Sequence, residues 1–348
     1  MKAFVQSGLI TNNDLDDFYS LHFQRAARTD KGVSAVKQII SLKLLNDMNL
    51  YLSEVNKILP PHIRLFSAKK VTKYFCSKNF CDGRTYSYLL PSFSLCPINQ
   101  VTTENYKADI DIIKEFNSIL KMFIGTHNFH NFTSGKKFVD PSSQRYIMSF
   151  ECSQPFTLSN NEKKIEFLLV EVKGQSFMLH QIRKMIGLAI GIIRGLVDKS
   201  IIIRSFEAEK LDIPIAPGLG LLLEEVHYDR YNKKYGGDGI HESLVWDEVN
   251  DQIISLKNTH IYPRIVETEI HEKSMFKWLE ILPIHSFDVR SNESFYNNKI
   301  LCKNEIELEV KEENEKIQEK ESIKTNLDNH EDFIESEPKK IKLQEIIE

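Results

Sequence analysis

A carboxylate flanked by two cations marks the part of this sequence that is best suited to chemistry. Arg28, Asp30 and Lys31 stand within four positions of one another, beside Gly32 and ahead of the apolar run at 38–44. Loops positioned by buried strands often carry catalytic groups, and an ionised aspartate in such a loop can act as a nucleophile. A solvated surface turn, capped by Asp30, has the same residue pattern. The segment alone therefore leaves a catalytic loop and a surface turn open.

The elements that must position this loop are mixed in type. β-rich or alternating segments predict strands at 38–44, 62–71, 84–90, 146–152, 165–172 and 221–228. Apolar residues at helical spacing predict helices at 47–59, 109–123, 177–195, 198–210, 243–256 and 269–282. Neither a βαβ series nor an internal repeat is evident. The pattern therefore favours an α+β fold, with a largely antiparallel sheet and helices packed on it.

Five short motifs follow one another along the chain. They are RTDKGVSA at 28–35, CDGRTYSY at 81–88, FIGTHNFHNF at 123–132, FMLHQIRKMIG at 177–187 and APGLGL at 216–221. Together they resemble the motifs of the TruA-type tRNA pseudouridine synthases, in particular of the eukaryotic nuclear branch. The resemblance implies the pseudouridine synthase fold, in which helices flank a largely antiparallel mixed sheet and an active-site cleft lies between two subdomains. It also implies an isomerase that converts specific uridines of tRNA to pseudouridine.

The resemblance assigns catalytic roles to Asp30, Arg183 and Tyr86. Asp30 matches the nucleophile that exchanges the N1–C1′ bond of uridine for a C5–C1′ bond, and attack on C1′ and a glycal-like route are both open. Removal of water disfavours an ionised carboxylate, so the site needs a nearby cation. Arg183 matches the family's basic residue at this place. The alternative interpretation of Arg183 is an arginine on the surface of a helix. Tyr86 matches a tyrosine that can stack on the displaced uracil and take part in proton transfer. The rearrangement is internal, so no cofactor is expected.

Further side chains are predicted to bind the RNA substrate. Arg28 matches the family residue that enters the RNA stack when the target base flips out. Lys31 and His127 lie in the same family motifs and are expected to contact the substrate, as is Tyr86. Residues 1–303 carry a net charge of +4, which permits a polyanionic partner. The expected partner is tRNA, with messenger and small nuclear RNA as open alternatives, and a monomer and a homodimer are both left open.

Metal and nucleotide sites are not expected. The spacing of His127 and His130, taken with Cys76 and Cys81, fits no zinc pattern. The GLG segment at 218–220 lacks the third glycine of a dinucleotide-binding loop. The five cysteines include no CxxC pair, which predicts free thiols rather than a disulfide framework or a redox site.

The chain divides by composition and resemblance into three parts. Residues 1–105 are the predicted N-terminal catalytic subdomain, 106–299 the C-terminal subdomain with a eukaryotic-type extension, and 300–348 an acidic disordered tail. The strand with which family members normally begin is apparently lacking, so we expect residues 1–22 to be poorly anchored. The missing strand makes a catalytically impaired RNA-binding protein on the same scaffold the alternative function.

Two features bear on where the protein acts. The segment PKKIK at 338–342 resembles a short nuclear-import signal, which predicts the nucleus, with the mitochondrion and the cytoplasm as alternatives. The best membrane candidate, 185–197, is shorter than the roughly 20 apolar residues that a span requires and contains Arg194. No membrane partner is therefore expected.

Overall fold

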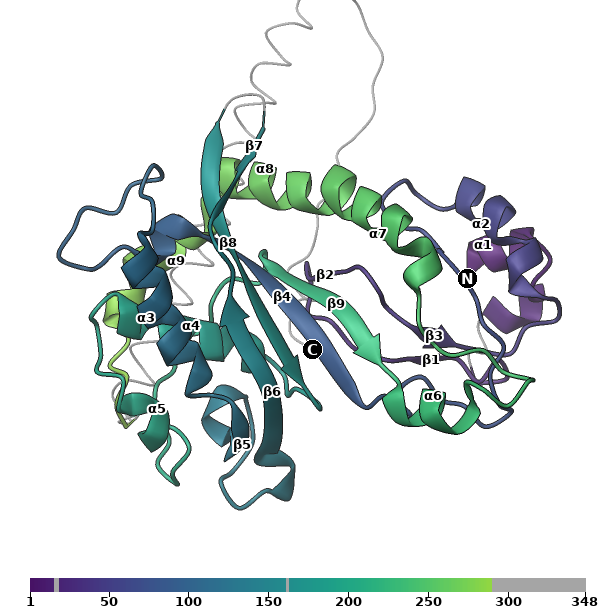
Figure 1. Ribbon diagram of the computed structural model, residues 1–348, viewed down its shortest axis with the longest axis horizontal. Helices are drawn as coiled ribbons and strands as arrows, with labels where there is room; N and C mark the ends of the chain where they lie inside the picture. The colour runs from purple at the N-terminus through teal and green to yellow at the C-terminus, as the bar shows by residue number, and fades with distance from the viewer. Residues whose placement is uncertain (16–18, 161–162, 290–348) are drawn as a thin grey trace, which may run out of the picture. The chain divides into compact units, whose positions relative to one another are not determined.

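A seven-stranded mixed sheet forms the centre of the chain, which the computed structural model describes for residues 1–15, 19–160 and 163–289. The strand order is β2-β9-β4-β8-β6-β5, and β7 pairs with β8 beside this path (Figure 1). Every ladder is antiparallel except the β2–β9 pair. The predicted α+β class with a largely antiparallel sheet is confirmed. The strands are β2 (Ser34–Ala35), β4 (Gly83–Pro91), β5 (Gly125–Asn128), β6 (Gln144–Cys152), β7 (Phe156–Ser159), β8 (Lys164–Gly174) and β9 (Leu221–His227).

Strand β4 is central in this sheet and is covered on both faces. All of its residues except Arg84 are buried. It pairs with β8 along its whole length and with β9 on the other side, where the register shifts between Thr85 and Tyr86. A β-bulge bends a strand and re-aims the side chains beside it. The irregularity thus lies next to the tyrosine that the family motif assigns to the active site.

The helices pack on the sheet and complete its core. α4 is buried along most of its length, and a Cβ added at Gly187 would lie 2.6 Å from the carbonyl oxygen of Pro214. Only glycine therefore allows α4 to lie this close to that backbone. α3 packs against both β6 and α4 through Ile113, Phe116 and Leu120. The helices are α1 (Lys2–Gln6), α2 (Leu52–Ile58), α3 (Ile110–Lys121), α4 (Gln181–Ile193), α5 (Ile201–Arg204), α6 (Asp229–Tyr235), α7 (Asn250–Leu256), α8 (Tyr262–Glu272) and α9 (Ser274–Ile281).

The N-terminal residues are packed, contrary to our expectation. Phe4 and Leu9 are buried in a second, smaller apolar cluster together with Met48 of the following segment and Val55 of α2. A short two-stranded sheet, β1 (Gln24–Arg25) with β3 (Ile40–Ser41), follows in the chain. The expectation that residues 1–22 are poorly anchored is therefore wrong for the part that the structure describes.

Some predicted elements are shortened or absent, because side chains satisfy the backbone there. The predicted strand at 62–71 forms no ladder; Asn56 instead bonds both the N–H and the carbonyl of Leu65, at 2.9 and 2.7 Å. The predicted helix at 198–210 is reduced to α5, and Asn131 donates to the carbonyl oxygens of Ser205 and Glu209 beyond its end. The acidic tail and the segment at 338–342 lie outside the described residues. None of the described helices is long and apolar enough to cross a membrane.

Candidate active site

The loop that carries Asp30 is fixed at both of its ends. Before it, the backbone N–H and carbonyl of Ala27 bond the side-chain amide of Gln38, at 3.2 and 3.0 Å. After it, Val33 N–H donates to the Asp30 carbonyl at 3.1 Å, and Gly32 takes a φ of +79°, which favours glycine. The chain then enters β2, the strand parallel to β9. Asp30 is thus held by the sheet at the end of a tight turn.

Asp30 faces Arg183 across the site. The guanidinium Nη1 lies 3.1 Å from Asp30 Oδ2, and the two side chains are 19% and 21% exposed. Arg183 also donates from Nε to the carbonyl oxygen of Ala216 at 2.7 Å, so two contacts fix its plane. Within the described chain Oδ1 of Asp30 accepts no hydrogen bond. The pair thus presents one carboxylate oxygen in contact with a cation and one oxygen without a hydrogen-bond partner among the described residues.

Tyr86, on β4, is near enough to Asp30 for the carboxylate to affect its pKa. Its ring meets the ring of Phe177 edge-on, with centroids 5.3 Å apart. Burial raises the pKa of Tyr86 to about 12, against the lowering effect of Arg84. The nearby Cys81 and Asp30 side chains add smaller contributions to this rise in the pKa. The hydroxyl is therefore protonated at neutral pH and can donate a hydrogen bond.

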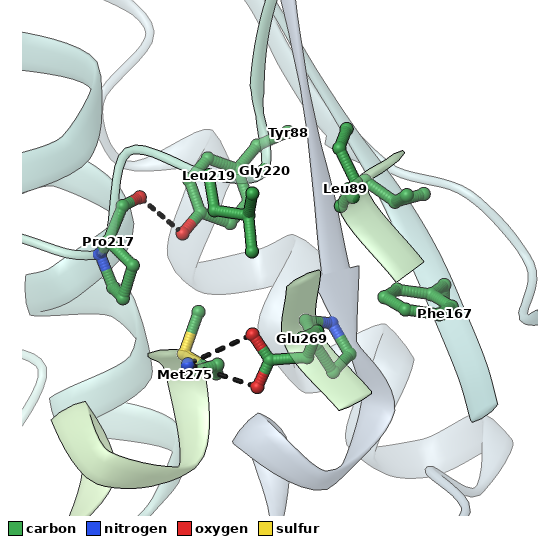
Figure 2. A pocket seen from close by; sticks show the side chains of 10 residues that line it. Tyr88, Leu89, Phe167, Pro217, Leu219, Gly220, Glu269 and Met275 are labelled. Atoms are coloured by element: carbon green, nitrogen blue, oxygen red, sulfur yellow. Dashed lines mark hydrogen bonds between the residues drawn. The ribbon is translucent and has the colours of Figure 1, made fainter. Parts of the chain in front are cut away.

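The turn that contains Ala216, which accepts a hydrogen bond from Arg183, also accepts one from Tyr88. Tyr88 donates from its hydroxyl to the carbonyl oxygen of Pro217 at 2.7 Å. Figure 2 shows this bond above a small cavity of about 10 Å³, into which the carboxyl group of Glu269 points from α8. Glu269 accepts from the backbone N–H of Met275 at 3.0 Å. Residues of α8 and α9 thus line the same cavity as the turn that accepts a hydrogen bond from Arg183.

The remaining predicted substrate residues are placed differently. Arg28 and Lys31 are exposed on the Asp30 loop, where they are accessible to a ligand. The ring of His127 instead stacks on Phe206, with centroids 4.2 Å apart, and its Nε2 lies 3.0 Å from the Ile124 carbonyl oxygen. The structure describes no contact between His127 and the Asp30 site. Arg28 and Lys31 therefore share a loop with Asp30, whereas His127 has partners of its own.

One residue that the sequence did not assign stands close to the carboxylate. His180 places its Nε2 3.6 Å from Asp30 Oδ2, on the oxygen that Arg183 also contacts. It stands three positions before Arg183 in the same motif, which was the signal available in the sequence. Within the described part of the chain, no cluster of three or more His, Cys, Asp or Glu side chains could hold a metal ion.

Comparison with known proteins identifies the family to which the chain belongs. The profile of a family described as tRNA pseudouridine synthase matches residues 119–229. The mouse protein named Pseudouridylate synthase 1 homolog is 47% identical over 290 residues, which are 82% of this chain and 67% of the mouse protein. The protein named tRNA pseudouridine synthase 1 from Yarrowia lipolytica is 33% identical over 350 residues, covering 77% of this chain and 66% of its own length. The chain belongs to the tRNA pseudouridine synthase family.

Membership of this family confirms the predicted family, its eukaryotic character, the pseudouridine synthase fold and the isomerase class. The matched human protein, named Pseudouridylate synthase 1 homolog, is likewise 47% identical over 290 residues. The chain spans about two thirds of the length of these relatives. The roles of individual site residues stay predictions.

Proposed function

We propose that the chain isomerises uridines of tRNA to pseudouridine, with Asp30 as the nucleophile. The observation that carries this proposal is the Asp30–Arg183 pair, in which Oδ2 contacts the cation and Oδ1 is left without a partner in the described chain. The relatives named tRNA pseudouridine synthase 1 support tRNA as the substrate. Arg183 favours the ionised form of the carboxylate in a partly closed site, which a nucleophile requires.

The reaction needs no atom from outside the nucleoside other than exchanged protons. The N1–C1′ bond breaks, the uracil rotates, and C5 bonds to C1′; the proton lost from C5 is balanced by one gained at N1. Asp30 Oδ1 can either add to C1′ or remove a ribose proton on a glycal-like route, and both routes use the same free oxygen. Tyr86, protonated at neutral pH, offers an aromatic ring on which the displaced base can stack and a hydroxyl donor.

Base flipping gives Arg28 its role in the proposal. A uridine within a stem must leave its stack, at a cost of about a few kcal/mol, before it can reach a half-buried carboxylate. Arg28 is exposed two residues before Asp30, so its guanidinium can occupy the vacated stack. Lys31 on the same loop is placed to contact phosphate. We also propose nuclear action, which a fluorescent fusion lacking the lysines of 338–342 would test.

The test is release of label from tRNA that carries tritium at uracil C5. The wild-type chain should release label, and Asp30→Asn and Asp30→Ala should release none while binding tRNA within about tenfold, because phosphate contacts dominate affinity. Asp111→Asn is the matched control, since it removes an exposed carboxylate from the first turn of α3 and should keep full turnover. Turnover by either Asp30 variant would refute the assignment. Binding without turnover by the wild type would favour the catalytically impaired RNA-binding protein.

A further inference from the structure

His180 occupies a backbone conformation that its side chain makes costly. It has a φ of +62° and a ψ of +4° at the N-cap of α4, in the left-handed region. A residue other than glycine or asparagine pays a steric cost there, because its Cβ crowds the next carbonyl. Such strained positions persist where the surrounding structure enforces them, and they cluster at functional sites.

The surroundings enforce this conformation through a closed turn. Gln181 accepts from Met178 N–H through its side-chain Oε1 at 2.9 Å and donates its own N–H to the Met178 carbonyl at 3.1 Å. The His180 carbonyl then accepts from Lys184 N–H at 2.9 Å, which begins the helix. The backbone is thus fixed on both sides of His180, and the direction of its Cα–Cβ bond is fixed with it.

The imidazole is aimed at the nucleophile. Its Nε2 lies 3.6 Å from Asp30 Oδ2, slightly too long for a hydrogen bond, and its Nδ1 is buried without a partner among the described residues. Contacts of this kind are often long in a free enzyme and tighten when substrate binds. Of the two neutral tautomers, the Nε2–H form points a donor at the carboxylate and buries only a lone pair. The other form would bury an unpaired N–H and point a lone pair at the carboxylate.

The protonation state of His180 is consistent with an Nε2–H donor that faces Asp30. Burial lowers the pKa of His180, and the Asp30 carboxylate opposes that effect by raising it. The nearby Arg183 and Lys184 also lower the pKa of His180. The imidazole is therefore neutral at pH 7, and it can donate one hydrogen bond without adding a second positive charge.

We infer that His180 is a positioning residue for Asp30: its Nε2–H and the Arg183 guanidinium hold Oδ2 together, and this presents Oδ1 to the ribose. The inference rests on the proposed function. With Arg183 alone the carboxylate could rotate about its Cβ–Cγ bond and exchange its two oxygens. A second donor on the same oxygen, mounted on the rigid start of α4, suppresses that rotation. The strained backbone of His180 is then explained, because it sets the imidazole in the required direction.

Two substitutions separate this role from a structural one. His180→Asn relieves the backbone, since asparagine tolerates the left-handed region, but its shorter amide does not reach Asp30. We expect an equal or higher Tm, unchanged tRNA affinity and a KM near the wild-type value. Its kcat should fall about tenfold to a hundredfold, the range for one hydrogen bond to a charged group. His180→Gln places an amide N–H near the position of Nε2 and should recover much of that kcat without raising the Tm.

Lys273→Asn is the matched control for backbone relief. Lys273 has a φ of +54° at the N-cap of α9 and pairs with Glu104 at 3.3 Å, outside the site. The Lys273→Asn variant should have an equal or higher Tm than the wild type and an unchanged kcat. Full activity of His180→Asn would overturn the inference, as would a joint fall of Tm and kcat that His180→Gln does not reverse. A wild-type chain that releases no label from C5-tritiated tRNA would instead contradict the proposed function, and with it the role given to His180.

Discussion

We predict that the buried carboxyl group of Glu269 makes the stability of this protein depend on pH near neutrality. Its side chain is 5% exposed and lines the small cavity beneath the Pro217 turn (Figure 2). Burial raises the pKa of Glu269 to about 7, although hydrogen bonds from the backbone of Met275 and Phe276 oppose the rise. The ordinary value is 4.5, so the folded protein binds a proton over a range in which the unfolded chain has lost it.

The sign of the effect follows from proton linkage. A pKa raised by folding contributes stability that is fully present below about pH 4.5 and is lost as the pH rises through about 7. The difference between the folded and unfolded pKa of Glu269 corresponds to about 3 kcal/mol in the free energy of unfolding, at about 1.4 kcal/mol per pKa unit. Glu269→Gln keeps an acceptor for the Met275 N–H and cannot ionise. It should therefore gain stability relative to the wild type by up to about 3 kcal/mol between pH 4.5 and pH 8.

The measurement is urea unfolding of the wild type and Glu269→Gln at several pH values. The difference in the free energy of unfolding between the two proteins should grow steadily over this range. Glu267→Gln is the control for the loss of one negative charge, because Glu267 lies exposed on the same helix. A difference between the wild type and Glu269→Gln that stays constant from pH 4.5 to pH 8 would refute the reasoning.

Two further predictions concern the site itself. Arg183→Met should lower kcat by about 10- to 100-fold, because a hydrogen bond between charged groups contributes about 1.5–3 kcal/mol. Arg183→Lys should recover only part of the lost kcat, because a lysine cannot contact both Asp30 and the Ala216 carbonyl as the arginine does. Label-release kinetics measure kcat for both variants. If Arg183→Met keeps the wild-type kcat, the role of the arginine is structural. Arg28→Ala should slow turnover of a stem uridine more than that of the same uridine in a single strand, because only the stacked base must be flipped. Arg25→Ala is the control, because Arg25 is an exposed arginine on β1. If Arg28→Ala slows turnover of both substrates equally, Arg28 has no role in base flipping.

The sequence predicted those parts of the fold in which local pattern and tertiary structure agree. The stripe at 109–123 became α3, with Asp109 capping its first turn through the N–H groups of Asp111 and Ile112. The segments at 84–90 and 221–228 became β4 and β9, which pair with each other. Asp30 and Arg183 could be named from their motifs, but their 3.1 Å contact joins residues 153 positions apart, and no local pattern encodes it.

The failures have a common physical cause. At 62–71 the alternation is that of a strand, yet a strand needs a partner, and the side chain of Asn56 satisfies the backbone of Leu65 instead. The apolar run from 177 predicts a continuous helix, yet α4 begins only at Gln181 because the Met178–Gln181 turn holds His180 in the left-handed region. In each case two hydrogen bonds that the local pattern does not predict outweigh a propensity that is small per residue.

Strand β9 explains why the site depends on the APGLGL motif, although no side chain of that motif reacts. In the turn before β9, the carbonyl oxygen of Ala216 accepts a hydrogen bond from Arg183, and the carbonyl oxygen of Pro217 accepts one from Tyr88. One edge of the strand pairs with β2, which directly follows the Asp30 loop, and the other pairs with the β4 segment that carries Tyr86. A Cβ added at Gly220 would lie 2.5 Å from the carbonyl oxygen of Leu89, so glycine is what lets the turn approach β4. Strand β9 and the turn before it thus connect the segments that carry Asp30, Arg183 and Tyr86, and a displacement of β9 would separate all three.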